Sequence, residues 1–536
     1  MKFNTSLSLL AVMIFVLTWQ RYSVNGKRIL IVTPTPMHSH QISYRSLWIE
    51  LHKRGHELVV VTPFRIEDPS LKNYTEIHFG AACEVFDQLT IDETTRRLAQ
   101  SETRMKVEYM SHILAEALLQ LPDFRKLYAS ESEEKFDAVI VETLFSPIFY
   151  ILGSRFDAPL IGILPLQLHN IDRYFAGSPI ISSHLSNWET EGITEDPTFW
   201  QRLRNFIDTW SCMYYWLYDY LPLQQSMARK YFGDDIPDIV EAGKNMSLIL
   251  ANSHAFNLYA RPDVPTVVYY NGGHITKIPP ALPTDLREFL DNATNGFIYM
   301  SLGTTIRYRF LSQRPKALLM NVLSKLPWPV VWKRDDMETV QQLSYNPNKI
   351  YFSNWVPQQG ILAHPNIKLF IYQGGLQSTE EAVHYGVPVL GIPIMFDQEH
   401  NMKKMVSLGA GQRLIMATLT EINMRNAIYE IIHNKSYKEK MLELRSLSKD
   451  LPYDPLKNAV WWIEYVIRTK GAPHLQFYDK NKPLYQQYNV DIIAFVVMVT
   501  NLILVLLLVL MLIFSWYAIK RCPSIYFTSL LKIRKE

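Results

Sequence analysis

A pair of glycines in the second half of the chain stands where it could bind a phosphate. The apolar run 367–371 leads through Gln373, Gly374 and Gly375 into a segment that reads as a helix beginning near Ser378. Glycines let the backbone approach a phosphate, and a helix start offers unpaired N–H groups at the positive end of its dipole. A glycine pair before a helix is often only a turn, so the surrounding residues decide its interpretation.

The glycine pair belongs to an ordered pattern of about 45 residues. Side chains that can stack on a flat ring or hydrogen-bond hydroxyl and phosphate oxygens recur through it. They are Trp355, Gln358, Gln377, Ser378, Glu381, Asp397 and Gln398. Thr304 and Thr305 add two hydroxyls after the apolar run 297–301. The pattern is typical of a site for a phosphorylated ligand.

The first half offers a candidate proton acceptor. His38 and His40 lie in the segment 34–40, directly after the apolar run 28–33. A histidine near its ordinary pKa is suited to act as a general base at neutral pH. Glu142 ends a further apolar run, and such a carboxylate can orient an imidazole. The alternative interpretation is that Glu142 is only a solvated carboxylate at the end of a strand.

Apolar runs that alternate with helical segments predict parallel α/β structure in both halves. We expect strands at 28–33, 57–62, 138–141, 297–301, 329–332 and 367–371, with a helix over 41–53. A proline-rich stretch, 261–285, separates the two halves and reads as a linker. The sequence therefore predicts two doubly wound, Rossmann-like domains that face a cleft.

The segment 199–232 is rich in aromatic residues, including Trp200, Phe206, Trp210 and Tyr214. We interpret it as a helix pair that packs into the core, in preference to an aromatic wall for a substrate.

The two ends of the chain are hydrophobic in different ways. Residues 7–17 form a short apolar core after Lys2, which predicts a cleaved secretory signal over 1–25. Residues 492–519 contain no charged side chain and are long enough to span a bilayer. The basic tail that follows places this end in the cytosol by the positive-inside tendency.

The expected organisation follows from these segments. It comprises a signal peptide, 1–25; an N-terminal domain, 26–260; a linker, 261–285; a C-terminal domain, 286–470; a juxtamembrane segment, 471–490; a transmembrane helix, 491–519; and a cytosolic basic tail, 520–536. The body, 26–490, would then be luminal, where sequons at Asn73, Asn245, Asn292 and Asn434 are usable.

Composition excludes several classes of protein. The net charge is +3 and no long basic run interrupts the body, so a nucleic-acid surface is not expected. Only Cys83 and Cys212 could pair in the lumen, because Cys522 lies beyond the apolar span. We expect no metal site, since no Cys/His cluster has zinc spacing and no Asp-x-Asp sequence occurs.

Together these features resemble the UDP-glycosyltransferase family of the endoplasmic reticulum, in its insect-type microsomal form. The resemblance covers nearly the whole chain and implies a GT-B arrangement, with an acceptor-binding domain at 26–260 and a UDP-sugar-binding domain at 286–470. It implies a UDP-sugar as co-substrate and no cofactor. It implies that Trp355 stacks on uracil, Gln358 binds the uridine and Glu381 binds the ribose. It assigns the diphosphate to Thr304, Thr305, Gln373, Gly374, Gly375, Gln377 and Ser378, and the sugar hydroxyls to Asp397 and Gln398.

The resemblance also selects His40 over His38 as the base and Glu142 as its supporting carboxylate. Direct displacement would then invert the sugar and give a β-glycoside. Many family members have His where this chain has Gln373, which we interpret as a subgroup trait. A catalytically silent lipophile binder is the alternative, against which the retained His40, Glu142 and Asp397 argue.

The identities of the donor sugar and of the acceptor follow less directly from the sequence. Members that use UDP-glucuronate carry an Arg at the position where an ungapped count places Asn252, so we expect UDP-glucose as donor. The acceptor is expected to be small and lipophilic, with xenobiotic, hormone and pigment substrates all open. Membrane confinement makes a homo-oligomer plausible, and a structural membrane glycoprotein would have no use for the nucleotide pattern.

Overall fold

The computed structural model describes residues 26–88, 100–183, 197–254, 256, 261–305, 308–341 and 344–521. The expected signal peptide, Cys522 and nearly all of the basic tail lie outside these ranges. The chain divides into two compact units, Met1–Phe477 and Tyr478–Glu536.

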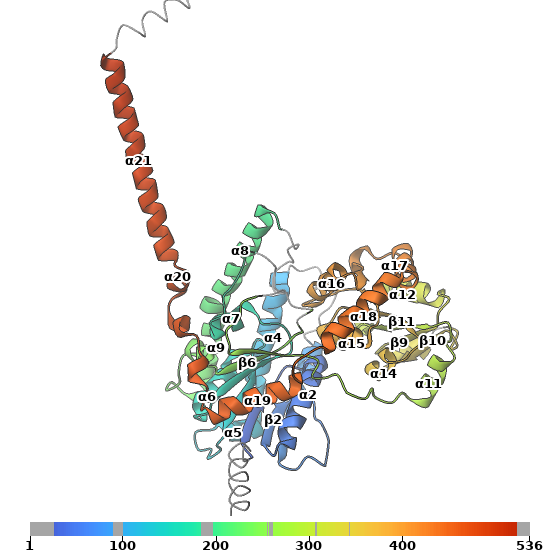
Figure 1. Ribbon diagram of the computed structural model, residues 1–536. Helices are drawn as coiled ribbons and strands as arrows, with labels where there is room; N and C mark the ends of the chain where they lie inside the picture. Colours follow the sequence, from blue (N-terminus) through green and yellow to red (C-terminus); the bar gives the residue numbers. More distant parts are fainter. Residues whose placement is uncertain are drawn as a thin grey trace, which may run out of the picture. The chain divides into compact units, whose positions relative to one another are not determined.

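The first unit contains two parallel sheets, each built from short runs rich in Val, Ile and Leu (Figure 1). The first sheet has seven strands in the order β3-β2-β1-β4-β5-β6-β7. Its strands are β1 (Arg28–Val32), β2 (Glu57–Thr62), β3 (Tyr74–His78), β4 (Ala138–Glu142), β5 (Leu160–Leu164), β6 (Leu248–Asn252) and β7 (Val267–Tyr270). The first domain also contains the helices α2 (His38–Lys53), α3 (Ala81–Gln88), α4 (Gln100–Gln120), α5 (Pro122–Tyr128), α6 (Ile151–Arg155), α7 (Asn170–Ala176), α8 (Phe199–Tyr215), α9 (Leu221–Phe232) and α10 (Ile239–Lys244).

The second sheet has six strands in the order β10-β9-β8-β11-β12-β13. They are β8 (Phe297–Ser301), β9 (Val330–Lys333), β10 (Ile350–Ser353), β11 (Ile367–Tyr372), β12 (Val389–Gly391) and β13 (Gly411–Arg413). Its helices are α11 (Thr284–Asp291), α12 (Gln313–Ser324), α13 (Met337–Gln341), α14 (Gln358–Leu362), α15 (Leu376–Tyr385), α16 (Gln398–Ser407), α17 (Glu421–His433) and α18 (Lys435–Lys449). Two apolar clusters of buried side chains line this sheet. The predicted pair of doubly wound domains is confirmed.

The strand order of each sheet reverses once, and ligands of such sheets bind outside the carboxyl ends of the strands at that point. In the first sheet the reversal lies between β1 and β4. The strand β1 leads into the segment that carries His40, and β4 ends at Glu142. In the second it lies between β8 and β11, which lead into Thr304 and Gln373. The topology thus brings the candidate residues to the ends of four strands.

Three predicted boundaries are wrong. The helix expected from residue 41 begins at His38, so His40 lies in the first turn of α2 and not in a loop. The expected linker contains β7, which pairs with β6 at the edge of the first sheet because Val267–Tyr270 is a run of β-branched and aromatic residues between Pro265 and Gly272. The second domain does not extend to residue 470.

The helix α19 (Pro455–Arg468) returns to the first domain and lies beside α2 (Figure 1). Its apolar side chains, including Val460 and Ile463, are buried in the same cluster as Trp48 and Leu51 of α2. Glu464 accepts a hydrogen bond from Arg54 at 3.0 Å. The last helix of the body therefore completes the core of the first domain.

The aromatic segment forms α8, a π-helical turn over Trp216–Tyr220, and α9. Trp216 and Tyr220 are buried as expected. The expectation of core packing is wrong for Trp200, Phe206 and Tyr214, which are exposed.

The second unit contains α20 (Leu484–Gln487) and the 32-residue helix α21 (Val490–Arg521). Among the described residues, α21 is the one helix long and apolar enough to cross a membrane. It fits a single-pass anchor and extends the predicted span, 491–519, by one or two residues at each end.

Candidate active site

One cavity of about 360 Å³ is lined by residues of both domains. All predicted site residues line it except Glu142 and Gly374. Glu142 lies behind His40, and Gly374 shapes the loop at the start of α15. Residues separated by more than 300 positions in the sequence therefore share one site.

The histidine His40 and the carboxylate of Glu142 form a buried pair. Nδ1 of His40 lies 3.2 Å from Oε1 of Glu142, and both side chains are almost fully buried. The hydroxyl of Tyr44 donates to the same oxygen at 3.1 Å, and the backbone N–H of Thr35 donates to Oε2 at 3.2 Å. These donors hold the carboxylate in place, so that it fixes the orientation of the imidazole. Nε2 of His40 is left as the ring nitrogen for a substrate hydroxyl.

The competing histidine His38 lies in an aromatic environment. Its ring contacts Phe64 and Trp355 edge-on, with centroids 5.5 and 4.9 Å away. Burial, with the charges of Arg45 and Lys333, lowers the pKa of His38 to about 4. Among the described residues its Nδ1 has no hydrogen-bond partner, so nothing orients this ring as Glu142 orients His40.

The side of the cavity formed by the first domain is mostly apolar around His40. Its lining there consists of Met37, Ile42, Val107, Leu144, Phe145 and Leu166. Phe145 adopts a left-handed backbone with φ 56°, which is uncommon for a bulky residue. Its ring stacks on His169 at 5.4 Å, and its carbonyl accepts a hydrogen bond from Tyr220. The wall suits a lipophilic molecule whose hydroxyl reaches His40.

Trp355 offers an exposed aromatic face on the side of the cavity formed by the second domain, with 54% of its surface accessible. Lys333 lies over its ring, 4.9 Å from the centroid, and donates to the carbonyl of Gly303 at 2.9 Å. Burial lowers the pKa of Lys333 to about 8. This lysine is not among the predicted site residues; its signal in the sequence is its place directly after the expected strand 329–332. It sets a cation near Thr304 and Thr305, where a diphosphate would need one.

The loop between β11 and α15 is shaped by Gly374. Its φ is 93°, and a Cβ there would come within 2.7 Å of Met402 and 2.8 Å of the carbonyl of Gln398. The helix α15 begins at Leu376, two residues before the predicted start, with Gly375 as its N-cap. Gln373 lies on the cavity wall, and among the described residues its Oε1 has no partner.

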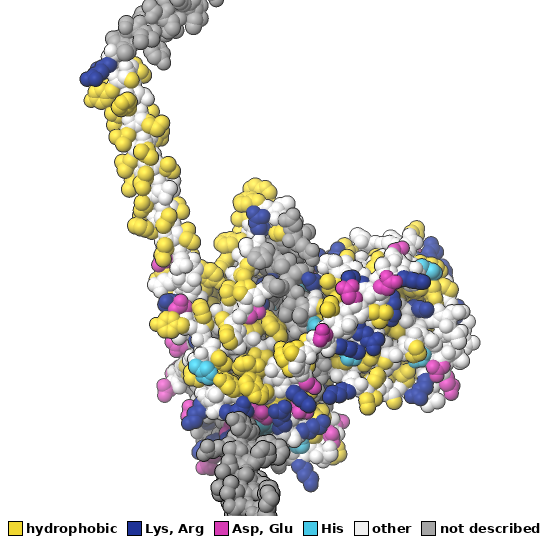
Figure 2. Space-filling view, viewed as in Figure 1, with side chains coloured by type: hydrophobic (Ala, Val, Ile, Leu, Met, Phe, Trp, Pro, Cys, Tyr) yellow, Lys and Arg dark blue, Asp and Glu magenta, His cyan; other side chains and the backbone are white. Residues whose placement is uncertain are grey.

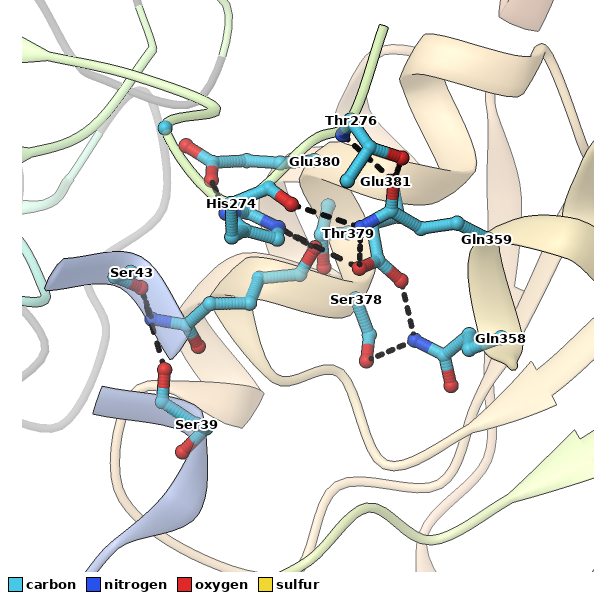
Figure 3. A network of polar contacts seen from close by, with 12 residues as sticks. Ser39, Ser43, His274, Thr276, Gln358, Gln359, Ser378, Thr379, Glu380 and Glu381 are labelled. Atoms are coloured by element: carbon cyan, nitrogen blue, oxygen red, sulfur yellow. Dashed lines mark hydrogen bonds and ion pairs between the residues drawn. The ribbon is translucent and has the colours of Figure 1, made fainter. Parts of the chain in front are cut away.

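The carboxylate Glu381 is held by two glutamines of α14 (Figure 3). Nε2 of Gln358 donates to it at 2.6 Å and also to Ser378 at 3.0 Å. Nε2 of Gln359, which is not among the predicted site residues, donates to it at 3.1 Å. Burial raises the pKa of Glu381 to about 7, against the effect of these two hydrogen bonds.

The first domain reaches this network through His274 and Thr276 (Figure 3). The carbonyl of His274 accepts from Gln359 at 2.9 Å, and Thr276 donates its N–H to the same amide at 2.9 Å. His274 Nε2 donates to the carbonyl of Gln377 at 3.1 Å, since the carbonyl can only accept. The network therefore joins the two domains beside the predicted ribose site.

Two expected roles do not match the contacts in the structure. Gln377, expected at the diphosphate, directs its amide to the first domain, where it donates to Ser43 at 3.2 Å and to the carbonyl of Pro165 at 3.0 Å. Asn252, the basis for the donor preference, is fully buried and is not among the residues that line the cavity. Its amide donates to Glu380 at 3.3 Å, because β6 ends against α15.

Asp397 and Gln398 line the cavity at the start of α16. Burial raises the pKa of Asp397 to about 6, although Asn401 donates to its carboxylate at 2.6 Å and the charge of nearby His40 acts in the opposite direction. The oxygen of Gln398 accepts from the backbone N–H groups of Ile394 and Met395 at 3.0 and 3.1 Å. Its amide N–H groups can donate to a ligand in the cavity.

The UDP-glucoronosyl and UDP-glucosyl transferase family matches residues 28–522. The chain is 32% identical over 483 residues to UDP-glycosyltransferase UGT5 of Dactylopius coccus, covering 88% of this chain and 89% of that protein. It is 30% identical to an ecdysteroid UDP-glucosyltransferase of Spodoptera littoralis nuclear polyhedrosis virus, covering 83% and 88%. It is 28% identical to human UDP-glucuronosyltransferase 1A5, covering 91% of each.

The solved structure of the glycosyltransferase VinC in complex with DTDP has the same fold, with a TM-score of 0.54 and 18% identity, over 82% of this chain and 100% of VinC. Its architecture agrees with the GT-B arrangement of two parallel-sheet domains. With the family match extending from the first strand to the end of the apolar helix, the chain belongs to the UDP-glucoronosyl and UDP-glucosyl transferase family and is a UDP-glycosyltransferase.

Proposed function

We propose that this enzyme transfers a hexose, preferably glucose, from its UDP-sugar to a hydroxyl of a small lipophilic acceptor, with inversion to a β-glycoside. The observation that carries the proposal is the buried pair of His40 and Glu142, 3.2 Å apart, between an apolar wall and the donor residues of the second domain. The alternative of a silent lipophile binder would have no use for an oriented imidazole in this position.

The reaction is a single displacement. The acceptor hydroxyl gives its proton to Nε2 of His40 while Glu142 stabilises the resulting imidazolium through Nδ1. The freed oxygen attacks C1 of the α-linked sugar, the bond from C1 to the diphosphate breaks, and UDP leaves with the electron pair from the opposite face. Positive charge at Lys333 and the N–H groups at the start of α15 stabilise the departing diphosphate.

The preference for glucose needs a basis other than Asn252. Asp397 places a carboxylate on the cavity wall where the resemblance expects the sugar, and the carboxylate of a glucuronate there would be repelled. Lys333 is the one lysine or arginine among the described residues that line the cavity, and it lies beside Trp355, at the nucleotide side. The relative named as an ecdysteroid UDP-glucosyltransferase supports the same choice. Competition between UDP-glucose and UDP-glucuronate in one reaction should yield mainly the glucoside; mainly glucuronide would contradict it.

We further propose that the enzyme is a single-pass protein of the endoplasmic reticulum membrane with a luminal body. The apolar helix α21 supports the anchor, followed by Lys520 and Arg521. The four sequon asparagines named above are all exposed, as luminal glycosylation would require.

The experiment that tests the catalytic assignment compares His40→Ala with His38→Ala. The first should lower kcat by about 10²–10⁴-fold, the usual contribution of a general base, with UDP affinity unchanged. The second should weaken UDP binding, since His38 contacts Trp355, and retain turnover at saturating donor. Initial rates and UDP titration are measured on both. The assignment is wrong if His38→Ala abolishes turnover and His40→Ala does not.

A further inference from the structure

The helix α8 exposes large apolar side chains and buries polar ones, which is the reverse of an ordinary surface helix. The side chains that it buries include the polar or small residues Asn205, Thr209 and Cys212. Large apolar side chains occupy the opposite face at helical spacing: Phe199, Trp200, Leu203, Phe206, Ile207, Tyr214 and, in the following π-helical turn, Tyr218. We call these seven residues the outer face of α8. A surface helix normally turns such a stripe toward the core, so this face is suited to a partner.

The outer face is well exposed. Trp200 has 73% of its surface accessible and Tyr218 65%. The rings contact one another along the helix, as in the pair Tyr214–Tyr218 at 4.7 Å. Figure 2 shows hydrophobic side chains gathered over α8, the green helix that stands out from the first domain in Figure 1.

The chemistry of the outer face fits a lipid surface. Tryptophan and tyrosine are enriched where proteins meet the headgroup region, because their rings are apolar and their N–H or O–H groups stay hydrated. Exposed Arg202 and Arg204 lie among the aromatic residues, where they can contact phosphate headgroups.

The position of α8 in the first domain also favours contact with a lipid surface. Phe477, the last residue of the folded body, packs against Gly177 at the end of α7, and α7 packs against α8. The chain then needs only Tyr478–Asn489 to reach α21. Twelve residues span at most roughly 40 Å, so the folded body stays close to any bilayer that α21 enters.

The inner face of α8 leads to the acceptor wall. Trp216, directly after α8, stacks on Phe145 with centroids 6.4 Å apart. Tyr220 donates its hydroxyl proton to the carbonyl of Phe145, and its oxygen lies 3.1 Å from the carbonyl of Glu108. A helix resting on lipid would therefore hold the apolar wall of the cavity close to the phase in which lipophilic acceptors dissolve.

We propose that the outer face of α8 lies on the surface of the lipid bilayer, as a second membrane contact besides the anchor. The proposal rests on the proposed membrane anchoring by α21. A second copy of the chain is the competing occupant, and the experiment below separates the two.

The test places a fluorophore on the outer face in the full-length chain. Ile207→Cys is labelled with a polarity-sensitive nitrobenzoxadiazole dye after reconstitution into phosphatidylcholine vesicles, with and without phosphatidylcholine carrying a doxyl quencher on its acyl chain. Ile422→Cys is the matched control, because Ile422 is also an exposed isoleucine on a helix, α17, in the second domain. The signal of the chain without an added cysteine is subtracted, and Tyr214→Cys provides a second position on the outer face.

The dye at 207 and at 214 should lose at least about half of its emission to the doxyl lipid, since an interfacial helix buries its apolar face roughly 5–10 Å into the bilayer. The dye at 422 should keep its emission. Equal emission with and without quencher at 207 and 214 overturns the proposal, and disulfide-linked dimers through position 207 would then identify a second copy as the occupant. Resistance of the protein to carbonate extraction is measured in parallel, so that loss of the anchor is distinguished from loss of the α8 contact.

Discussion

At the scale of the residue, Asp397 links the acidity of the medium to recognition of the sugar. Burial raises its pKa to about 6, so below that pH the side chain is protonated, carries an O–H donor and accepts fewer hydrogen bonds. The proposed role on sugar hydroxyls therefore predicts that UDP-glucose binds more tightly than UDP above pH 6, and that this advantage falls as the pH drops through 6. Calorimetric titration of both ligands between pH 5 and 8 measures the ratio of the Kd for UDP to the Kd for UDP-glucose.

The matched variant is Asp397→Asn, which keeps the size of the side chain and removes the ionisation. It should bind UDP normally and UDP-glucose about 10- to 100-fold less tightly at pH 7, the magnitude of one or two hydrogen bonds to a charged group. Its ratio should not change with pH. A wild-type ratio that is constant from pH 5 to 8 would exclude the role of Asp397, whatever the behaviour of His40 in turnover.

At the scale of the element, α15 carries a buried acid at the contact between the domains. Burial raises the pKa of Glu380 to about 8, and Asn252 donates to one of its oxygens while the other has no partner among the described residues. The folded pKa lies above the unfolded value near 4.5, so this group stabilises the fold fully below pH 4.5, and that contribution is lost as the pH rises toward 8.

Glu380→Gln should remove this dependence. We expect the variant and the wild type to have the same Tm near pH 5. At pH 8.5 the variant should have the higher Tm, with a free energy of unfolding larger by on the order of a few kcal/mol. Thermal unfolding across this pH range measures it. Glu439→Gln is the control, since Glu439 is exposed on α18 and its substitution should leave the pH profile unchanged. If Glu380→Gln lowers Tm equally at both pH values, the carboxyl is ionised in the folded protein.

At the scale of the whole molecule, the proposed topology makes one strong prediction. The body, residues 26–490, should resist added protease in sealed microsomes and become sensitive once detergent opens them. Glycosidase treatment should also lower the apparent mass, because the four sequon asparagines are exposed. An immunoblot of the two digestions suffices. Cleavage of the body in intact vesicles would reverse the proposed orientation.

The loop and helix that follow β11 could be predicted from sequence because they belong to one continuous segment. The order strand, glycine pair, helix dictates its own geometry, and β11, Gly374 and α15 appear as expected within two residues. The pair of His40 and Glu142 was indicated by the resemblance to the family, and the structure places the two residues together because β1 and β4 are neighbouring parallel strands.

The remaining contacts depend on packing between distant segments. Lys333 reaches the cavity only because β9 lies beside β8, and Gln377 faces Ser43 only because the two domains meet there. An ungapped count along the chain selects Asn252, but such a count cannot show that its side chain turns toward Glu380.

The sequence by itself determined the glycine loop, the apolar span and six strands, β1, β2, β4, β8, β9 and β11, because each depends on residues close together in the chain. The tertiary structure alone decided that β7 and α19 belong to the first domain, that His274 and Gln359 join the two domains, and that α8 turns its aromatic face outward. The physical reason is that an apolar pattern specifies a face to be covered but not what covers it.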